Sequence, residues 1–172
     1  CRRFIGQSPF LVIGTTRPGS GTDVSPRGDA PGFVQVIDDR TLAIPDRLGN
    51  NRVDTMSNLV HDPAVGLIFF IPGIDETLRV NGRAHLTASS DLLDSFVMEG
   101  KAPRSVTVIA VEEIYFHCAR AVMRAGLWNP AKHVDPRSLP TPGEILAGMS
   151  NNEVGGEKYD REWLDRAQAT LW

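Results

Sequence analysis

The sequence predicts a mainly β fold of the α+β class, an antiparallel barrel with short helices between some of its strands. About six short runs rich in β-branched and apolar residues are separated by turn residues. Neither a G-x-G-x-x-G motif nor a P-loop occurs, so the two commonest nucleotide-binding motifs are excluded. Several short strands with interspersed helices favour a barrel over a doubly wound parallel sheet.

Composition and charge narrow the class of protein. The chain has 172 residues, of which 41% are hydrophobic, and this is enough for one compact core. Its 18 basic and 21 acidic residues give a net charge of -3. Because no global positive field exists to hold a phosphate polymer, we expect no nucleic-acid partner.

Cysteine usage and hydropathy indicate a soluble, cytoplasmic protein. The two cysteines, Cys1 and Cys118, have no metal-ligand spacing, so we expect no metal site and a reducing compartment. No apolar run approaches the roughly 18 residues that span a bilayer, and the first residues lack the apolar centre of a signal peptide. We therefore expect no membrane association. Because the chain begins at Cys1, we also expect a native segment to precede it.

The first third of the chain is predicted to form strands. Residues 10–16 are an apolar, β-branched run closed by the turn residues 17–21. Further strands are expected at 22–27, 32–37 and 41–44. The short spacing between them predicts an antiparallel meander.

A helix and a hairpin follow. Apolar residues at helical spacing predict a helix over 50–60, with Asn50 or Asn51 as its N-cap. Residues 64–71 and 77–86 are expected to be strands joined by a Pro-Gly turn. In the second of these strands polar and apolar residues alternate, so one face of the hairpin is predicted to be polar.

The rest of the chain divides into a last part of the barrel and a tail. We expect a helix over 90–99 and a strand over 105–111 that continues to His117. After Trp128 the sequence becomes proline-rich, and Thr141-Pro142-Gly143-Glu144 is typical of a capping box. Helices are expected at 144–150 and 160–171. The predicted organisation is a barrel over 1–128 and a proline-rich linker with a helical tail, packed on the barrel, over 129–172.

The predicted helix start at Asn50 is a candidate anion site. Its free amides and the positive end of its dipole point at the space before it, and Arg47 and Arg52 flank that space. An arginine presents a planar fork that suits phosphate oxygens. The alternative from composition alone is that Asn50 is a simple cap and that both arginines are solvated surface groups.

Four motifs, VSPRGD, IPDRLGNNR, HDPAVGLIF and ETLRVNGRA, follow one another in this order along the chain. In order and spacing they resemble the pyridoxamine 5'-phosphate oxidase-like family of FMN-binding split barrels, in a branch with a PDRxGNNR form. The resemblance covers roughly residues 4–128. It implies a six-stranded split barrel and a homodimer, with two FMN sites at the interface lined by both subunits.

The first two motifs carry most of the implied cofactor residues. Val24, Ser25, Pro26 and Arg27 match the family strand whose backbone lies along the isoalloxazine ring, with Arg27 as its basic group. A second set of implied cofactor residues begins at the end of the strand predicted over 41–44.

In this second set, Pro45 and Asp46 match the pair that ends a strand beside the flavin. Asn51 and Arg52 match two basic residues that bind the phosphate. Because Asn51 stands where the family has a basic residue, we expect Arg47 to supply the missing positive charge.

The remaining implied residues lie further along the chain. Thr77 stands where the family usually has a glutamine that hydrogen-bonds the flavin, and Arg124 and Trp128 stand where the family closes over flavin and substrate. Arg120 and Arg124 are four residues apart, so on a helix they share a face and could hold an anion. The alternative is a solvated basic face with Trp128 as a packing residue.

Two classes of function fit this reading. In the preferred one the protein is an FMN-dependent oxidoreductase acting on a small molecule or reduced nicotinamide, in which the flavin does the chemistry. In the alternative it is a non-catalytic flavin-binding or redox-sensing module. Pyridoxamine 5'-phosphate oxidation is less favoured, because the segment after His117 lacks the family's substrate-phosphate pattern. A preference for deazaflavin or haem is also left open.

Overall fold

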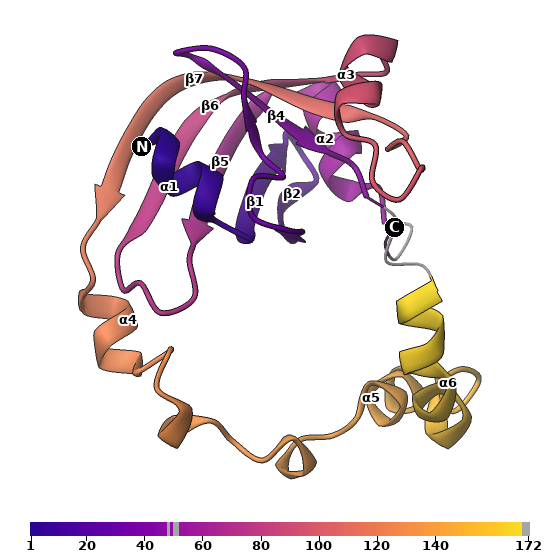
Figure 1. The fold of residues 1–172 in the computed structure, drawn as a ribbon. Coiled ribbons are helices and arrows are strands. Elements are labelled where there is room, and N and C mark those ends of the chain that lie inside the picture. The colour runs from indigo at the N-terminus through magenta and orange to yellow at the C-terminus, as the bar shows by residue number, and fades with distance from the viewer. Residues whose placement is uncertain (48, 50–51, 170–172) are drawn as a thin grey trace. The chain divides into compact units, whose positions relative to one another are not determined.

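The computed structural model describes residues 1–47, 49 and 52–169. It divides into two compact units, Cys1–Trp128 and Asn129–Trp172. Among the described residues, no helix is both long and apolar enough to span a bilayer. The first unit holds the sheet (Figure 1).

The first unit contains strands with helices between some of them, and the described elements of the second unit are all helical (Figure 1). In chain order they are α1 Arg2–Gln7, β1 Phe10–Arg17, β2 Gly21–Gly28, β3 Gln35–Val36, β4 Thr41–Pro45, α2 Asp54–His61, β5 Ala64–Phe70, β6 Thr77–Thr87, α3 Ser90–Ser95, β7 Val106–His117, α4 Arg120–Ala125, η1 Pro130–Lys132, η2 Pro136–Ser138, α5 Pro142–Met149 and α6 Gly156–Ala169.

The described strands form one antiparallel sheet in the order β2-β1-β5-β6-β7-β4-β3. The mainly β, antiparallel prediction is confirmed, but the described strands number seven rather than six. Each of the seven runs predicted as strands forms one, although the run at 32–37 is shortened to the two residues of β3, which pairs with β4. Of the predicted meander, the antiparallel pairs β1–β2 and β3–β4 are confirmed, but the pairing of β2 with β3 is wrong, because these two strands lie at opposite edges of the sheet. The reason is that Phe33 and Val34, in the segment that joins β2 to β3, are buried in the core with 8% and 2% of their surface exposed. The next strand, β4, then pairs with β7.

The core lies on one face of the curved sheet. Alternate residues of β1, β5 and β6 point into it, and Leu11, Phe69 and Leu78 are fully buried. The predicted polar face of β6 is confirmed at Arg79, Asn81 and Arg83, which alternate with buried residues. The same alternation predicts Thr77 on this polar face, but Thr77 is buried.

Helix α2 begins later than predicted. Its first residue is Asp54 and its N-cap is Val53, so the prediction of a start at Asn50 with an asparagine cap is wrong. Asp54 brings a negative charge to the first turn, where the helix dipole favours it, and accepts a hydrogen bond from Arg52 Nε at 2.9 Å. Asn58 Nδ2 donates to Thr15 Oγ1 at 3.1 Å, which fastens α2 to β1.

The other helices show which local sequence signals are sufficient to predict where a helix begins or ends. The capping box is present: Glu144 N donates to Thr141 Oγ1 and Thr141 N donates to Glu144 Oε2, at 3.1 and 2.7 Å. Helix α6 begins at Gly156, earlier than the predicted residue 160, and α3 ends at Ser95 rather than at Glu99. Helix α1 was not predicted. It is fixed by tertiary contacts such as the edge-to-face packing of Phe4 on Phe116.

Candidate functional site

A cluster of charged and hydroxyl side chains lies along the inner face of β2. Asp23, Ser25 and Arg27 alternate on this strand and pair with the inward-pointing residues of β1. Arg27 donates to Ser25 Oγ, to the Pro26 carbonyl at 2.8 Å and to Thr55 Oγ1 at 3.3 Å. Thr55 in turn donates to Asp23 Oδ2 at 2.9 Å. The edge strand and the first turn of α2 are thus joined through Arg27.

Two charges in this cluster are partly removed from water. Burial lowers the pKa of Arg27, and the charges of Asp46 and Asp23 oppose that shift. Burial likewise raises the pKa of Asp46, opposed by the positive charges of Arg27 and Arg104. Asp46 is held by its backbone, whose N–H donates to the Ser105 carbonyl at 2.9 Å. Opposite charges that are desolvated together are frequent at functional sites.

Arg47 occupies a different position from Arg27. Its Nε donates to Asp29 Oδ2 at 2.8 Å and its Nη1 donates to the Phe96 carbonyl at 2.8 Å. The side chain of Asp29 is 0% exposed and that of Arg47 is 16% exposed. This buried ion pair fastens the segment after β4 to the end of β2 and to α3. The geometry favours a positioning role for Arg47 over the predicted contact with phosphate.

Arg52 lies at the surface just before α2. Its Nε is 2.9 Å from Asp54 Oδ2, and this hydrogen bond, with the charge of Asp54, raises the pKa of Arg52. The charge of Asp23 also raises the pKa of Arg52, so the electrostatic field of the β2 cluster reaches Arg52. Two further predicted site residues, Asn50 and Asn51, lie outside the described residues.

The other residues of the first two motifs point elsewhere. Val24 and Pro26 alternate with Arg27 and lie on the outer face of the sheet, where Val24 is 66% exposed. Pro45 is buried at the end of β4 and pairs with Val106. Side chains of the VSPRGD strand are therefore divided between the two faces, and the inner cluster contains Ser25 and Arg27.

A second group of predicted residues lies around the start of β6. Thr77 is buried and pairs with His117. Trp128 Nε1 donates to the Ile74 carbonyl at 2.8 Å, just before that strand, while Arg124 is exposed on α4.

This second group is separated from Asp46 by the length of a strand. Thr87, at the far end of β6, pairs with Val106, and Val106 also pairs with Pro45. The ten residues from Thr77 to Thr87 correspond to roughly 33 Å along the strand. The structure therefore does not bring Thr77, Arg124 and Trp128 together with Asp46 within one chain.

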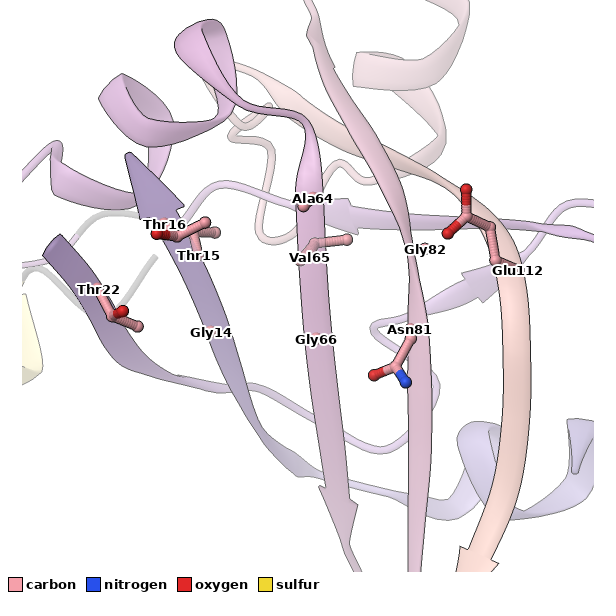
Figure 2. Close-up of a pocket in the computed structure, with 10 residues that line it drawn as sticks. All are labelled: Gly14, Thr15, Thr16, Thr22, Ala64, Val65, Gly66, Asn81, Gly82 and Glu112. Carbon is pink, nitrogen blue, oxygen red and sulfur yellow. The ribbon is translucent and has the colours of Figure 1, made fainter. Parts of the chain in front are cut away.

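The outer face of the sheet contains a hollow of about 320 Å³. It forms where Gly14 and Gly66 pair on neighbouring strands, since neither has a side chain to fill the space. Figure 2 shows Thr16 and Thr22 to one side of these glycines and Asn81 and Glu112 to the other; the remaining lining residues are Thr15, Ala64, Val65 and Gly82.

Some of these features were missed by sequence reasoning. Asp23 could have been found, because it is four residues before Arg27 on a strand and so shares its face. Thr55 and Arg104 could not have been found from the sequence, because they belong to segments that are distant from β2 along the chain. Among the described residues, no group of three or more His, Cys, Asp or Glu side chains could hold a metal ion. Both cysteines are free and exposed.

Comparisons with known proteins agree with the fold. HupZ from Group A Streptococcus is 15% identical over 67% of this chain and 89% of its own, with a TM-score of 0.54. General Stress Protein 26 from Bacillus anthracis strain Sterne is 15% identical over 66% of this chain and 88% of its own, with a TM-score of 0.50. At this identity they show the fold alone. A search of curated proteins found no significant match.

Fold and sequence together define the class. The antiparallel sheet with its short helices is a split barrel of the kind found in pyridoxamine 5'-phosphate oxidase-like proteins. The family model described as pyridoxamine 5'-phosphate oxidase matches residues 1–118. The chain belongs to this family.

Proposed function

We propose that this protein is an FMN-binding flavoprotein that acts as an FMN-dependent oxidoreductase on a small molecule or reduced nicotinamide. The observation that carries the proposal is the partly buried Arg27 guanidinium on the inner face of β2, which donates to Thr55 in the first turn of α2 and whose pKa is influenced by the charges of Asp46 and Asp23. Family membership supports it, because Ser25, Arg27 and Asp46 fall in the motifs that resemble the family's flavin site.

The residues present fit a flavin mononucleotide. Arg27 and Arg52 would hold the phosphate, and Arg27 is already oriented by Ser25 and Thr55. The backbone of β2 and the Pro45–Asp46 pair would lie beside the ring system. When bound, FMN supplies hydride or electron transfer, and the protein supplies position and electrostatics.

We expect FMN to bind more tightly than riboflavin by at least about tenfold, because charge-assisted hydrogen bonds recognise the phosphate. Arg52→Ala is expected to weaken FMN binding on the order of tenfold and to leave riboflavin binding unchanged. Fluorescence titration of both flavins measures this.

Arg137→Ala is the matched control for this titration, because Arg137 is another exposed arginine with an aspartate partner two residues away, at 2.8 Å. It should bind FMN as the wild type does. Equal affinities of the wild type for FMN and riboflavin would remove the phosphate site.

Turnover can be tested separately from binding. If the protein is an oxidoreductase that accepts reduced nicotinamide, anaerobic addition of NADH or NADPH will reduce the flavin and bleach its visible absorbance. A flavin spectrum that persists with either donor and with small-molecule reductants would favour the flavin-binding or redox-sensing module instead.

We further propose a homodimer whose two chains share each flavin site. One chain separates Thr77, Arg124 and Trp128 from Asp46 by the length of β6. A second copy, related by a two-fold axis, would supply this group to the site of the first, since such an interface uses the same patch twice.

The outer face of β1, β2 and β5 is the surface we assign to this contact. On this face Phe10 is 41% exposed and Val24 is 66% exposed. The ring of Phe10 packs on that of Phe70, with the ring centroids 6.1 Å apart. Apolar patches of this kind mark interaction sites. The hollow at Gly14 and Gly66 lies on the same face (Figure 2) and offers space for a side chain of the partner.

We expect Gly66→Lys to dissociate the dimer and to release FMN together with it, because a charged side chain would stand in the middle of this face. Sedimentation across protein concentration, with flavin fluorescence followed in the same samples, measures both events. Arg83→Lys, which keeps the charge of an exposed residue on β6, is the control. A stable monomer that retains FMN would contradict the shared site.

A further inference from the structure

The hollow at Gly14 and Gly66 presents a hydrogen-bond acceptor. Asn81 pairs with Gly66 across β5 and β6, and a Cβ atom at Gly66 would lie 3.6 Å from Asn81 Oδ1. Asn81 Nδ2 donates to Glu113 Oε2 at 3.0 Å, so the amide is oriented with its donor on Glu113 and its oxygen towards the glycine. The hollow therefore favours a group that donates hydrogen bonds.

Glu112 adds a negative charge to the same hollow. It is the extra residue at the register shift between β6 and β7, and an extra residue of this kind re-aims a side chain. Glu112 is exposed and lines the hollow together with Asn81 (Figure 2). A carboxylate and an amide oxygen suit a cation that donates several hydrogen bonds, and the planar fork of a guanidinium is such a cation.

The arginine and glutamate residues on this side of β6 and β7 differ in their partners. Arg79 lies over the ring of Tyr115, 5.3 Å from its centroid, and Glu113 accepts the hydrogen bond described above. Arg83 and Glu112 are exposed, and within the part of the chain that the structure describes neither side chain has an ion pair or a hydrogen bond. One positive and one negative charge on the same face are thus without a partner in their own chain.

We propose that Arg83 of a second copy of this chain enters the hollow and pairs with Glu112, and that two-fold symmetry makes this contact twice. In an interface of this type residue i contacts j and j contacts i, so one face of the chain must carry both partners. Arg83 meets this requirement, because it lies two residues from Asn81 on β6 and shares its face. The inference rests on the homodimer of the proposed function.

The dimensions of the sheet allow this contact. Ala64 pairs with Arg83, so Arg83 and Gly66 are diagonal neighbours roughly 7 to 8 Å apart. A two-fold axis midway between them would place each Arg83 over the hollow of the other copy, across the roughly 10 Å that separates packed sheets. The two glycines leave room for the guanidinium, and the apolar part of the face lies beside it on β1, β2 and β5.

Charge reversal at both positions tests the pair. Arg83→Glu brings two carboxylates together at each contact, and Glu112→Arg brings two guanidinium groups together. We therefore expect each variant to dimerise at least about a hundredfold more weakly than the wild type, from about tenfold at each of the two contacts. Mixed in equal amounts, the two variants should form a heterodimer of nearly wild-type affinity, because both contacts then join opposite charges. Sedimentation of each variant and of the mixture measures this.

Arg137→Glu is the control, because it reverses the charge of an exposed arginine in the other unit, and it should dimerise as the wild type does. If either test variant also dimerises as the wild type does, or if the mixture stays monomeric while the wild type dimerises, the pair is overturned and the proposed homodimer stands. A wild type that is monomeric at every concentration overturns the homodimer and the pair together, and leaves a cation other than Arg83 as the occupant of the hollow.

A milder pair of variants decides the question if a reversal prevents folding, which circular dichroism detects. Arg83→Gln and Glu112→Gln each remove one charge and keep a polar side chain. Both should weaken the wild-type dimer by similar factors, because each removes the same two contacts. A dimer that neither substitution weakens would overturn the pair.

Discussion

Asp29→Asn is expected to destabilise the protein by about 3 kcal/mol, at the lower end of the range for breaking a buried ion pair. The variant keeps an acceptor for Ala30 N but removes the charge that faces Arg47 across 2.8 Å. With 16% of its side chain exposed, Arg47 can recover part of its hydration, which places the effect at that lower end. Urea unfolding followed by tryptophan fluorescence measures the change.

An exposed pair provides the control for Asp29→Asn. Asp135 accepts hydrogen bonds from Arg137 Nε and Nη2, but the Arg137 side chain is 90% exposed, so Asp135→Asn should leave the unfolding midpoint unchanged. Replacing both partners by apolar residues, Asp29→Leu with Arg47→Met, should recover much of the lost stability. If Asp29→Asn unfolds at the same urea concentration as Asp135→Asn, the buried pair does not hold the segment after β4.

The strands of the barrel could be predicted because burial on one face imposes a period of two. On β6 this pattern is unbroken from Leu78 to Ala84, so the strand and its polar face follow from the sequence. Strand β3 lies within the strand predicted over 32–37, but its length of two residues and its place at the edge of the sheet could not be predicted in the same way. Two residues carry no period, and their pairing with β4 depends on Phe33 and Val34 entering the core.

The start of α2 shows how a local signal was overruled. Asn50 and Asn51 are good capping residues, yet the helix begins at Asp54 with Val53 as its N-cap. The ion pair between Arg47 and Asp29 fixes the chain just before this segment, and Asn58 fixes the helix on β1. Such long-range contacts are invisible in a window of ten residues.

The candidate site could be predicted only in part, because some of its contacts are also long-range. The family resemblance pointed to Arg27, Asp46 and Arg52, and the structure relates these three through charge interactions with one another or with Asp23. That Arg47 would turn to Asp29 could not be predicted, because the two residues meet through the packing of β2 against the segment after β4. The separation of Thr77 from Asp46 likewise required the register of β6 and β7.

Gly82→Ala is expected to destabilise the protein by about 3 kcal/mol or more, through overpacking that the backbone cannot relieve. Gly82 lies at the register shift between β6 and β7, where Glu112 is the extra residue. A Cβ atom at this position would lie 2.2 Å from the carbonyl oxygen of Ala110 and 3.2 Å from Cγ2 of Ile109. Because the first of these atoms is backbone, relief requires the ladder between the two strands to open.

The same substitution elsewhere on the sheet separates this clash from the general effect of replacing glycine. At Gly14 a Cβ would lie 3.8 Å from the Gly66 carbonyl oxygen, which is an ordinary van der Waals contact. Gly14→Ala should therefore be neutral, or stabilising by up to about 1 kcal/mol through the unfolded state. Urea unfolding of both variants tests the difference. If Gly82→Ala and Gly14→Ala unfold at the same concentration, the strands at the register shift are further apart than described, and Gly82 is not required there.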